Sequence, residues 1–358
     1  MKRILITGGA GFVGSALARY LKHAVAGSSV VAFDNLKRRG SELNLPLLRE
    51  SGVDYVHGDI RSRSDLSVLH GDFDLLIDAS AEPSVHAGTG GSPDYVVETN
   101  LVGTFNCLDF ARQRGCSFIL LSTSRVYSIQ PLREILLAEG KTRFEISDGQ
   151  TIPGITREGV SEDFPTHLAR SFYGASKLGA EHLVQEFAHA YGLQAVILRC
   201  GVIAGPGQFG KADQGVFTMW VAHHYFNVPV RYIGFGGEGK QVRDLLHIQD
   251  LCELTGSIVK SLGEHSGDVL NVGGGIERSI SLMELTELCR RVVGNSVATS
   301  GISDTAGFDV PLYVSDCRKV FARYDWRPKR SVETLVADIY EWIRANERAL
   351  KPLFTEVR

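Results

Sequence analysis

Two side chains one helical turn apart could carry acid–base chemistry. Tyr173 and Lys177 lie in the run Tyr-Gly-Ala-Ser-Lys, so that on a helix the phenol and the ammonium project from the same face. A free tyrosine has a pKa of about 10, and nearby positive charge lowers that pKa until the phenolate can accept a hydroxyl proton at neutral pH. Such a pair is common on protein surfaces. It indicates catalysis only together with a second signal, such as a cofactor site.

Residues near the N-terminus supply that signal. Gly8 and Gly11 stand between a predicted strand over 3–7 and a predicted helix over 12–23, and Gly14 lies in the first turn of that helix. Glycines at this spacing permit a tight turn, close approach of a pyrophosphate and close packing of the helix on the strand. The helix N-terminus then offers free N–H groups and the positive end of its dipole to phosphates. The pattern predicts a dinucleotide-binding turn.

Asp34 supports the same interpretation. It ends the second predicted strand, 20 residues beyond Gly14, where a carboxylate accepts hydrogen bonds from the adenosine ribose and repels a 2′-phosphate. This favours NAD over NADP. Lys37, Arg38 and Arg39 follow closely and could bind a 2′-phosphate, which weakens the preference.

Hydroxyls at the end of a later strand are candidates for holding a substrate. The predicted strand over 118–122 leads through Ser122 into Thr123 and Ser124. Side chains at the carboxyl end of a parallel strand face the ligand cleft, so one of these hydroxyls could hold the substrate hydroxyl beside Tyr173. The same hydroxyls could instead satisfy loop backbone groups. Both interpretations stay open on these residues alone.

The elements that must position these residues alternate between short apolar runs and longer helical patterns over the first 200 residues. This alternation predicts an α/β fold with a doubly wound parallel (Rossmann) sheet, whose ligands bind at the carboxyl ends of the strands. The predicted strands are 3–7, 30–34, 55–57, 75–78, 118–122 and 195–198, and the predicted helices are 12–23, 93–114 and 173–191.

Beyond residue 200 the alternation of predicted strands and helices ends. Glycine-rich loops separate shorter helices, and Ser331 is predicted to cap a closing helix over 331–348. We expect residues 1–200 to form the Rossmann domain. Residues 201–358 are expected to form mainly a smaller, mixed α/β substrate-binding lobe, with some segments returning to the first domain. The long polar stretch 128–171 is predicted to be an irregular functional loop inserted in the first domain.

Composition limits the classes of function. Of the 358 residues, 44% are hydrophobic and 22% are charged, the balance of a soluble globular protein. The net charge of -3 gives no general attraction to nucleic acid or to an anionic membrane, and no apolar stretch approaches the length of a membrane span. The six cysteines form no CxxC pair and no metal-ligand spacing. We therefore expect a cytoplasmic protein with reduced thiols, no metal site, and no nucleic-acid or membrane partner.

The glycine turn with Asp34, the hydroxyls at 122–124 and the Tyr173–Lys177 pair follow one another along the chain. Together they resemble the extended short-chain dehydrogenase/reductase family, and the resemblance covers nearly the whole chain. The resemblance implies NAD as cofactor, a catalytic trio of Thr123, Tyr173 and Lys177, and a homodimer or higher homo-oligomer formed through the helices 93–114 and 173–191. The cofactor site that it implies consists of Gly8, Gly11, Phe12, Val13, Gly14, Asp34, Asn35, Leu36, Arg39, Gly40, Asp59, Ile60, Ala79, Ser80, Ala81, Asn100, Ser122, Tyr173, Lys177, Cys200 and Val202.

Within the family the chain resembles enzymes that epimerise nucleotide-linked sugars. Arg243, in the run Gln-Val-Arg-Asp, matches the family's diphosphate-binding arginine, and its planar guanidinium can bind phosphate oxygens bidentately. The substrate site that the resemblance implies consists of Pro83, Ser84, Thr123, Ser124, Arg125, Tyr173, Gln208, Phe209, Gln214, Gly215, Gln241 and Arg243.

The likeness is greatest to the CDP-paratose 2-epimerases, also called CDP-tyvelose epimerases. It is carried by the segments 33–40, 213–215 and 236–244 and by Thr-Arg-Phe at 142–144 in the insertion. Two places depart from the family. Val202 stands where many relatives carry an asparagine, and the segment 307–309 lacks an arginine expected close by. The resemblance therefore supports the reaction class more than it supports a CDP-sugar as the substrate.

The implied reaction is epimerisation by transient oxidation. Tyr173 would take a hydroxyl proton while the hydride passes to the nicotinamide, and the keto sugar would be reduced again on its opposite face, at C2. A 4-epimerase uses the same residues and stays open. A 4,6-dehydratase would need an acid–base pair where Ser124 and Arg125 stand, and a decarboxylase would need a glutamate at Arg125. The alternative from another class, a non-catalytic dinucleotide-binding sensor, has no need of both Tyr173 and Lys177.

Overall fold

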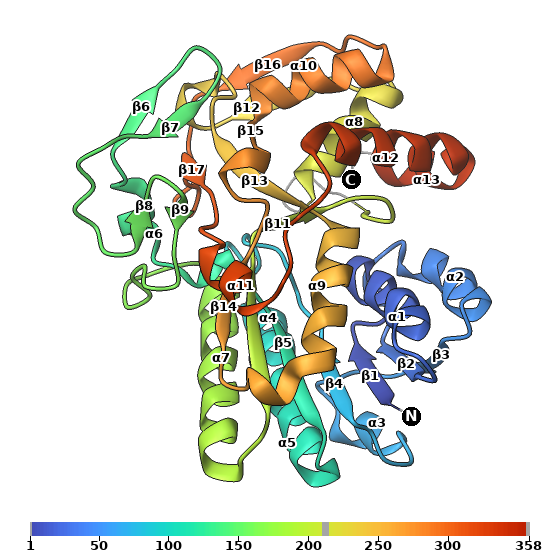
Figure 1. Ribbon diagram of the computed structural model, residues 1–358. Coiled ribbons are helices and arrows are strands. Elements are labelled where there is room, and N and C mark those ends of the chain that lie inside the picture. The colour runs from blue at the N-terminus through green and yellow to red at the C-terminus, as the bar shows by residue number, and fades with distance from the viewer. Residues whose placement is uncertain (1, 210–214, 356–358) are drawn as a thin grey trace.

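A computed structural model describes residues 2–209 and 215–355, with a seven-stranded parallel sheet at the centre of the molecule (Figure 1). The strand order is β3-β2-β1-β4-β5-β10-β14. This confirms the predicted doubly wound α/β class, which was readable because strands buried on both faces are continuously apolar. The strands are β1 (Arg3–Thr7), β2 (Ser29–Asp34), β3 (Asp54–His57), β4 (Leu75–Asp78), β5 (Ser117–Thr123), β10 (Ala195–Cys200) and β14 (Val269–Val272).

The edge strand β14 has no counterpart among the predicted strands. It pairs with β10 in parallel, with Ile197 opposite Val269 and Cys200 opposite Val272. Its four residues include a central asparagine, so no long apolar run marks it in the sequence. A strand this short is decided by its pairing partner rather than by its own composition.

Helices cover both faces of the sheet and bury two separate apolar cores against it. On one face Leu17 of α1 and Leu254 of α9 belong to a single core, and on the other Leu108 of α5 and Val184 of α7 share a second core. These and the shorter helices of this layer are α1 (Phe12–Ala24), α2 (Leu45–Glu50), α3 (Arg63–Ser67), α4 (Asp94–Val97), α5 (Thr104–Arg114), α7 (Phe172–Tyr191), α9 (Ile248–Ser261) and α11 (Arg318–Arg323).

The stretch predicted as one helix over 93–114 contains a wider turn. Between α4 and α5 the backbone forms a π-helical turn, η2 (Glu98–Gly103), that holds Asn100. A π turn inserts an extra residue into a helix and changes which side chains share a face, and such turns occur frequently at functional sites. The periodicity of the sequence predicted the extent of the helical stretch and missed the turn.

A smaller lobe begins just after β10 ends, at the carboxyl edge of the sheet, with β11 as its first strand. Its core surrounds Trp220, which stacks on Tyr232 with ring centroids 6.0 Å apart. The elements of this lobe are β11 (Val202–Ala204), β12 (Val230–Ile233), β13 (Val242–His247), β15 (Ser279–Ser281), β16 (Thr299–Ile302), β17 (Leu312–Tyr313), α8 (Val216–Tyr225), α10 (Leu282–Val293), α12 (Val332–Ala345) and α13 (Glu347–Thr355).

The closing helix is split in two. Ser331 caps α12 by accepting a hydrogen bond from the Thr334 amide, as predicted. The predicted single helix over 331–348 is nevertheless interrupted at Asn346, whose backbone φ of -123° is not helical, and α13 follows. The backbone break at one residue left the apolar pattern unchanged, so the sequence did not reveal it.

The insertion 128–171 is ordered, contrary to the predicted irregular loop. It forms α6 (Ile129–Arg133) and two hairpins, β6 (Leu137–Glu139) with β7 (Phe144–Ile146) and β8 (Ile155–Thr156) with β9 (Gly159–Val160). The hairpins bind the smaller lobe: the Phe144 amide donates to the Lys240 carbonyl at 3.1 Å, and the Val160 amide to the Val314 carbonyl at 2.8 Å. Such long-range pairing explains why a polar, turn-rich stretch is ordered.

Two further expectations concern the chain as a whole. No helix within residues 2–209 and 215–355 is long and apolar enough to cross a bilayer. The six cysteines are buried free thiols. Burial raises the pKa of Cys116, Cys200 and Cys252 to about 12, so these thiols stay protonated and poorly nucleophilic at neutral pH.

Candidate active site

The glycine turn after β1 leaves no room for larger residues. Gly8 has a φ of +64°, and a Cβ on it would lie 2.7 Å from the Ala79 carbonyl oxygen at the end of β4. A Cβ on Gly14 would lie 2.0 Å from the Gly8 carbonyl oxygen. Gly11 is the N-cap of α1, so that Phe12 and Val13 form the first turn and their N–H groups are available to a phosphate. The turn has the form that a dinucleotide pyrophosphate requires.

Asp34 fixes the end of β2 to this turn. Its carboxylate accepts hydrogen bonds from the amides of Ala10 and Leu36 at 3.1 and 2.7 Å. Burial raises the pKa of Asp34, and these backbone donors oppose that rise. Leu36 follows with a φ of +54°, a left-handed conformation that is strained for leucine and turns the chain sharply after the strand. Lone pairs on the Asp34 carboxylate remain for ribose hydroxyls.

Polar residues beside Asp34 form the predicted adenosine side. The Asn35 amide donates to the Asp59 carboxylate at 2.9 Å, and Arg61 pairs with the same carboxylate at 2.7 Å. Although burial acts in the opposite direction, these donors lower the pKa of Asp59 to about 2. Ile60 is buried against Gly103, where a Cβ would lie 2.5 Å from its methyl group. Asp59 therefore stays ionised and holds Asn35 in place.

One of the basic residues that follow Asp34 contacts the start of the smaller lobe. Arg38 donates to the Phe209 carbonyl at 3.0 Å, whereas Arg39 is exposed. Gly40, with a φ of +96°, lies against the Phe209 ring. Phe209, predicted to contact substrate, thus helps to fix the loop that follows Asp34.

Lys177 presents a buried ammonium at the nicotinamide end of the predicted site. Its side chain is 1% exposed, and its Nζ atom has no hydrogen-bond partner within the part of the chain that the structure describes. Burial lowers the pKa of Lys177, and the carboxylates of Asp78 and Glu181 oppose this. A buried ammonium without acceptors is costly. The ribose hydroxyls of a bound dinucleotide would supply the acceptors, so the residues present fit this cofactor.

Asp78 is a carboxylate that the sequence did not single out. It is fully buried at the end of β4, where it accepts hydrogen bonds from Thr7 and Thr104 at 2.7 Å each and from the Ser80 amide at 3.1 Å. It therefore shapes the wall formed by Ala79, Ser80 and Ala81. The sequence could have indicated Asp78 as a site residue, because it is the last residue of a predicted strand and so lies at the edge of the sheet where ligands bind.

Asn100, on the π-helical turn, connects two loops of the site. Its side-chain oxygen accepts from the Glu82 amide at 2.8 Å, and its nitrogen donates to the Glu82 carbonyl and to the Ser176 hydroxyl, each at 3.1 Å. Ser176 in turn donates to the Tyr173 carbonyl at 2.9 Å. Asn100 therefore fixes the loop after β4, which contains Pro83 and Ser84, to α7, the helix of Tyr173 and Lys177.

Tyr173 and Thr123 meet at the carboxyl end of β5, where sequence analysis placed them. Ser171 caps α7 and puts Tyr173 in its first turn. The pKa of Tyr173 is raised by burial, and the neighbouring Thr123 hydroxyl and the charge of Arg125 act to lower it. The lowered pKa that we expected from Lys177 and a positive nicotinamide ring together is thus not reached by the folded chain alone. The phenol needs further positive charge, which an oxidised nicotinamide carries.

A buried ion pair lies behind this edge and was also missed. Glu181 binds Arg199 through two of the arginine nitrogens and accepts a hydrogen bond from the Ser122 hydroxyl. Ser122 is thereby directed to Glu181. The signal was available, because Glu181 follows Lys177 by four residues and shares its helix face.

Arg243, on β13, faces the segment 308–310. Its Nη2 donates to the Asp309 carboxylate at 3.1 Å and to the Val310 carbonyl at 2.8 Å. Arg125, in the turn after Thr123, donates to the Phe308 carbonyl at 3.1 Å. The structure therefore brings both guanidinium groups to the segment 308–310, and Asp309, which pairs with Arg243, was not among the predicted residues.

Other predicted substrate residues have partners within the smaller lobe or at its edge. The Gln208 amide donates to the Ile203 carbonyl and accepts from Thr218, and the Gln241 amide donates to the Ile233 carbonyl. Both side chains are buried, and their contact with a substrate stays a prediction. Gly215 caps α8, and Val202 begins β11. Gln214 lies outside the described residues.

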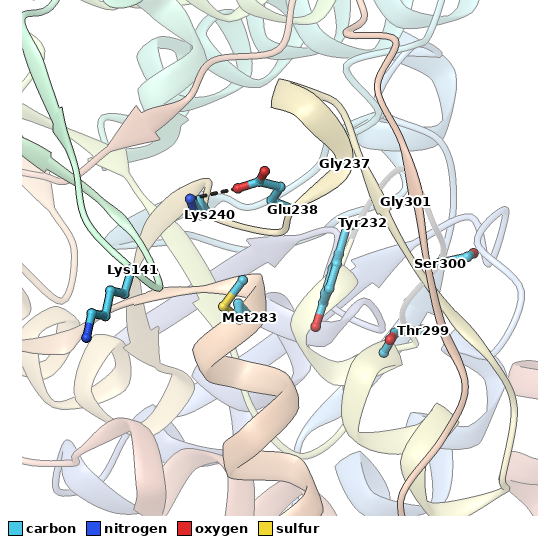
Figure 2. Close-up of a pocket in the computed structure, with 9 residues that line it drawn as sticks. All are labelled: Lys141, Tyr232, Gly237, Glu238, Lys240, Met283, Thr299, Ser300 and Gly301. Carbon is cyan, nitrogen blue, oxygen red and sulfur yellow. Dashed lines mark ion pairs between the residues drawn. The ribbon is translucent and has the colours of Figure 1, made fainter.

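Two surface hollows lie near these elements, and neither is lined by a predicted site residue. One opens beside the start of α7, where Ser171, Phe172 and Phe308 are among its lining residues. The other is lined mainly by the smaller lobe, together with Lys141 of the insertion. In Figure 2 its Lys240 points to Glu238, with which it pairs at 2.7 Å. The segment 236–244 therefore contributes to two different places: Lys240 lines this hollow, and Arg243 binds Asp309.

Comparison with known proteins identifies relatives of similar length. Residues 4–273 match the NAD dependent epimerase/dehydratase family. The chain is 31% identical to the CDP-paratose 2-epimerase of Salmonella typhi over 348 residues, covering 95% of this chain and 98% of that protein. It is 32% identical to the low-salt glycan biosynthesis protein Agl12 of Haloferax volcanii over 333 residues, covering 92% and 94%.

A solved structure extends the comparison to three dimensions. The UDP-glucuronic acid 4-epimerase of Bacillus cereus, in complex with UDP-glucuronic acid and NAD, matches with a TM-score of 0.78 and 25% identity, covering 96% of this chain and 99% of that one. The predicted family and cofactor are confirmed. The protein is an enzyme of the NAD-dependent epimerase/dehydratase family, and NAD is its cofactor.

Proposed function

We propose that the protein epimerises a nucleotide-linked sugar, at C2 of a CDP-hexose. The observation that carries the proposal is that the Tyr173 phenol and the Thr123 hydroxyl lie close together at the carboxyl edge of the sheet, with the buried ammonium of Lys177 one helical turn away. A hydroxyl and a phenol so placed can both contact one hydroxyl of a sugar.

The chain's own residues hold the sugar and move its proton. NAD, when bound, supplies a reversible hydride acceptor, so that the sugar carbon can pass through a ketone and be reduced on its opposite face. Tyr173 accepts the hydroxyl proton at its phenol oxygen and later returns it. Thr123 holds the same hydroxyl, and Lys177 holds ribose hydroxyls and contributes positive charge near the phenol.

The finer assignment to C2 and to cytidine rests on the resemblance of the chain to CDP-paratose 2-epimerase, which covers 95% of it. The segments 33–40, 213–215 and 236–244 support it. A 4-epimerase is the second candidate, favoured by the likeness to the UDP-glucuronic acid 4-epimerase structure. Elimination of water is disfavoured, because Ser124 and Arg125 follow Thr123 where an acid–base pair of carboxylates would be needed.

Isotopic labels distinguish these reactions. A panel of CDP-, UDP-, GDP- and dTDP-sugars is first tested for turnover by NMR. A substrate deuterated at C2 should then react more slowly and retain its deuterium at C2 of the inverted product. The same sugar deuterated at C4 is the matched control and should react at the normal rate. An isotope effect at C4 alone would assign the enzyme as a 4-epimerase, and loss of deuterium to water would exclude the hydride mechanism.

A further inference from the structure

Arg125 lies beside both groups that are proposed to contact the reacting hydroxyl. It belongs to the short turn η3 (Ser124–Val126) that follows β5, and its amide donates to the Thr123 hydroxyl at 3.2 Å. Its carbonyl packs against the first turn of α7, where a Cβ on Gly174 would lie 2.1 Å from the carbonyl oxygen. Gly174 directly follows Tyr173 in the chain. The backbone of Arg125 is therefore fixed between Thr123 and the turn that holds Tyr173.

The guanidinium of Arg125 is held by a backbone group of the smaller lobe and not by a carboxylate. Its Nη1 donates to the Phe308 carbonyl at 3.1 Å. Within residues 2–209 and 215–355 it forms no ion pair, whereas Arg243, which binds the same segment, pairs with Asp309 at 3.1 Å. A carbonyl oxygen carries no net charge, so it fixes the direction of the Arg125 guanidinium without neutralising it.

Most of the surroundings of the Tyr173 phenol oppose its ionisation. Burial raises the pKa of Tyr173, and the neighbouring groups of Cys200, at the end of β10, and Glu82, in the loop after β4, raise it further. The Thr123 hydroxyl and the positive charge of Arg125 act in the opposite direction. A base that must accept a proton at neutral pH needs such a charge, because a positive neighbour favours the phenolate.

The titratable neighbours of Arg125 leave its charge in place. Burial lowers the pKa of the guanidinium, and Asp309, Tyr173 and Tyr313 oppose this effect. Arginine has so high a pKa that it keeps its proton at neutral pH in such surroundings. Lys177, one turn further along α7, is also a cation, but two nearby carboxylates offset its charge. Arg125 therefore supplies the phenol with positive charge that no ion pair within the described ranges neutralises.

We propose that Arg125 is a positioning residue that acts through Tyr173: its guanidinium, held by the Phe308 carbonyl, stabilises the phenolate form of the base. The inference rests on the proposed function, because it takes Tyr173 as the proton acceptor. Arg125 itself exchanges no proton, since the proton passes from the sugar hydroxyl to the Tyr173 oxygen and back. A charge that is fixed before the reaction needs no reorganisation when the phenolate forms. Arg125 also stays charged in both oxidation states of the cofactor.

Arg133, on α6, provides a matched control. It binds the same segment as Arg125, through the carbonyls of Ala306 and Asp309 at 2.6 and 2.8 Å. Arg133→Gln removes one positive charge and weakens the attachment of the segment, but it leaves Arg125 and its contact with Phe308 in place. The variant therefore separates a loosened segment from the loss of the Arg125 charge.

The test is ultraviolet difference titration of the NAD-loaded protein without substrate, with Tyr173→Phe subtracted. Arg125→Gln keeps a donor for the Phe308 carbonyl and removes the charge. It should raise the pKa of Tyr173 by about one unit, the lower end of the range for a neighbouring charge. Arg125→Lys should recover most of this shift, and Arg133→Gln should titrate as the unaltered protein does. Glu82→Gln should lower the pKa, because it removes a negative charge near the phenol.

The acid limb of kcat/KM is the second readout, and in Arg125→Gln it should move to higher pH with the phenol. Retained NAD and an unchanged circular dichroism spectrum establish that each variant is folded. An unchanged Tyr173 pKa in Arg125→Gln would overturn the inference, also where KM is raised, since Arg125 would then only bind substrate. An equal shift in Arg133→Gln would overturn it too, because the segment would then be responsible. Failure of the proposed function looks different: the titration would show the shifts, but no sugar nucleotide would be turned over.

Discussion

Glu181 and Arg199 form a buried, two-pronged ion pair directly behind the catalytic edge. Arg199 donates from Nε and Nη2 to one Glu181 oxygen at 3.1 and 2.8 Å, and the side chain of Glu181 is 1% exposed. Glu181 lies one turn beyond Lys177 on α7, and Arg199 also contacts Tyr127 and the Glu162 carbonyl of the insertion. The pair therefore joins α7 to β10 and to the insertion.

Removal of one partner of this pair should be more harmful than removal of both. Glu181→Gln leaves a buried guanidinium without its counter-charge, and we expect a loss of about 3–5 kcal/mol in the free energy of unfolding. The double variant Glu181→Gln with Arg199→Met should recover part of that loss. Urea unfolding of the NAD-loaded protein measures both. Equal destabilisation by the single and double variants would show that the pair's charges are not coupled.

Asp78→Asn should make kcat/KM fall at a lower pH on the alkaline side of the pH–rate profile. The charged and titratable groups around Lys177 are Asp78, Glu181, Cys107 and Cys200, and loss of the Asp78 charge lowers the pKa of Lys177 further than burial already does. The ammonium then loses its proton at a lower pH. We expect the alkaline limb of kcat/KM to move to lower pH, while NAD remains bound.

The Lys177 pKa can be followed directly by NMR of protein labelled at the lysine Cε. Asp109→Asn, on α5, is the control for net charge, because its carboxylate pairs with Arg112 at the surface. An alkaline limb at the same pH in Asp78→Asn and in the unaltered protein would show that Asp78 has no effect on Lys177.

Tyr173→Phe should abolish epimerisation and leave NAD binding intact. The substitution removes the phenol oxygen that accepts the proton, while Ser171, the cap of α7, and the Asn100–Ser176 contact stay in place. Turnover is measured by NMR and bound cofactor by mass spectrometry after denaturation. Retention of more than about a tenth of the activity, an increase of under 1.4 kcal/mol in the barrier, would mean that another group is the base.

The oxidation state of the cofactor should change the titration of Tyr173. Burial raises the phenol pKa in the folded chain, so the neutral phenol is favoured and proton removal requires a higher pH than in a free tyrosine. The positive charge of oxidised NAD lowers this pKa, and reduced NADH does not carry that charge. Ultraviolet difference titration, with Tyr173→Phe subtracted, should give a lower pKa with NAD than with NADH. Identical pKa values in the two states would count against the electrostatic role of the cofactor.

The sequence by itself determined the class of fold and the type of chemistry. Gly8, Gly14 and Asp34 predicted the dinucleotide turn because their spacing follows from local geometry, namely a strand, a tight turn and the end of the next strand. Tyr173 and Lys177 predicted an acid–base pair because four residues on a helix place two side chains on one face. Such relations involve few intervening residues, and burial on both faces of the sheet left a readable apolar pattern.

The tertiary structure decided which distant residues meet and what environment they share. The sequence spacing does not predict that Arg125 and Arg243 both contact the segment 308–310, or that Thr7 and Thr104 enclose Asp78. Each of these contacts involves elements far apart in the chain. The direction of the Tyr173 pKa shift was likewise decided by burial, whose effect on the phenol exceeded that of nearby charge. Burial and long-range pairing are properties of the packed molecule, and a linear order of residues does not contain them.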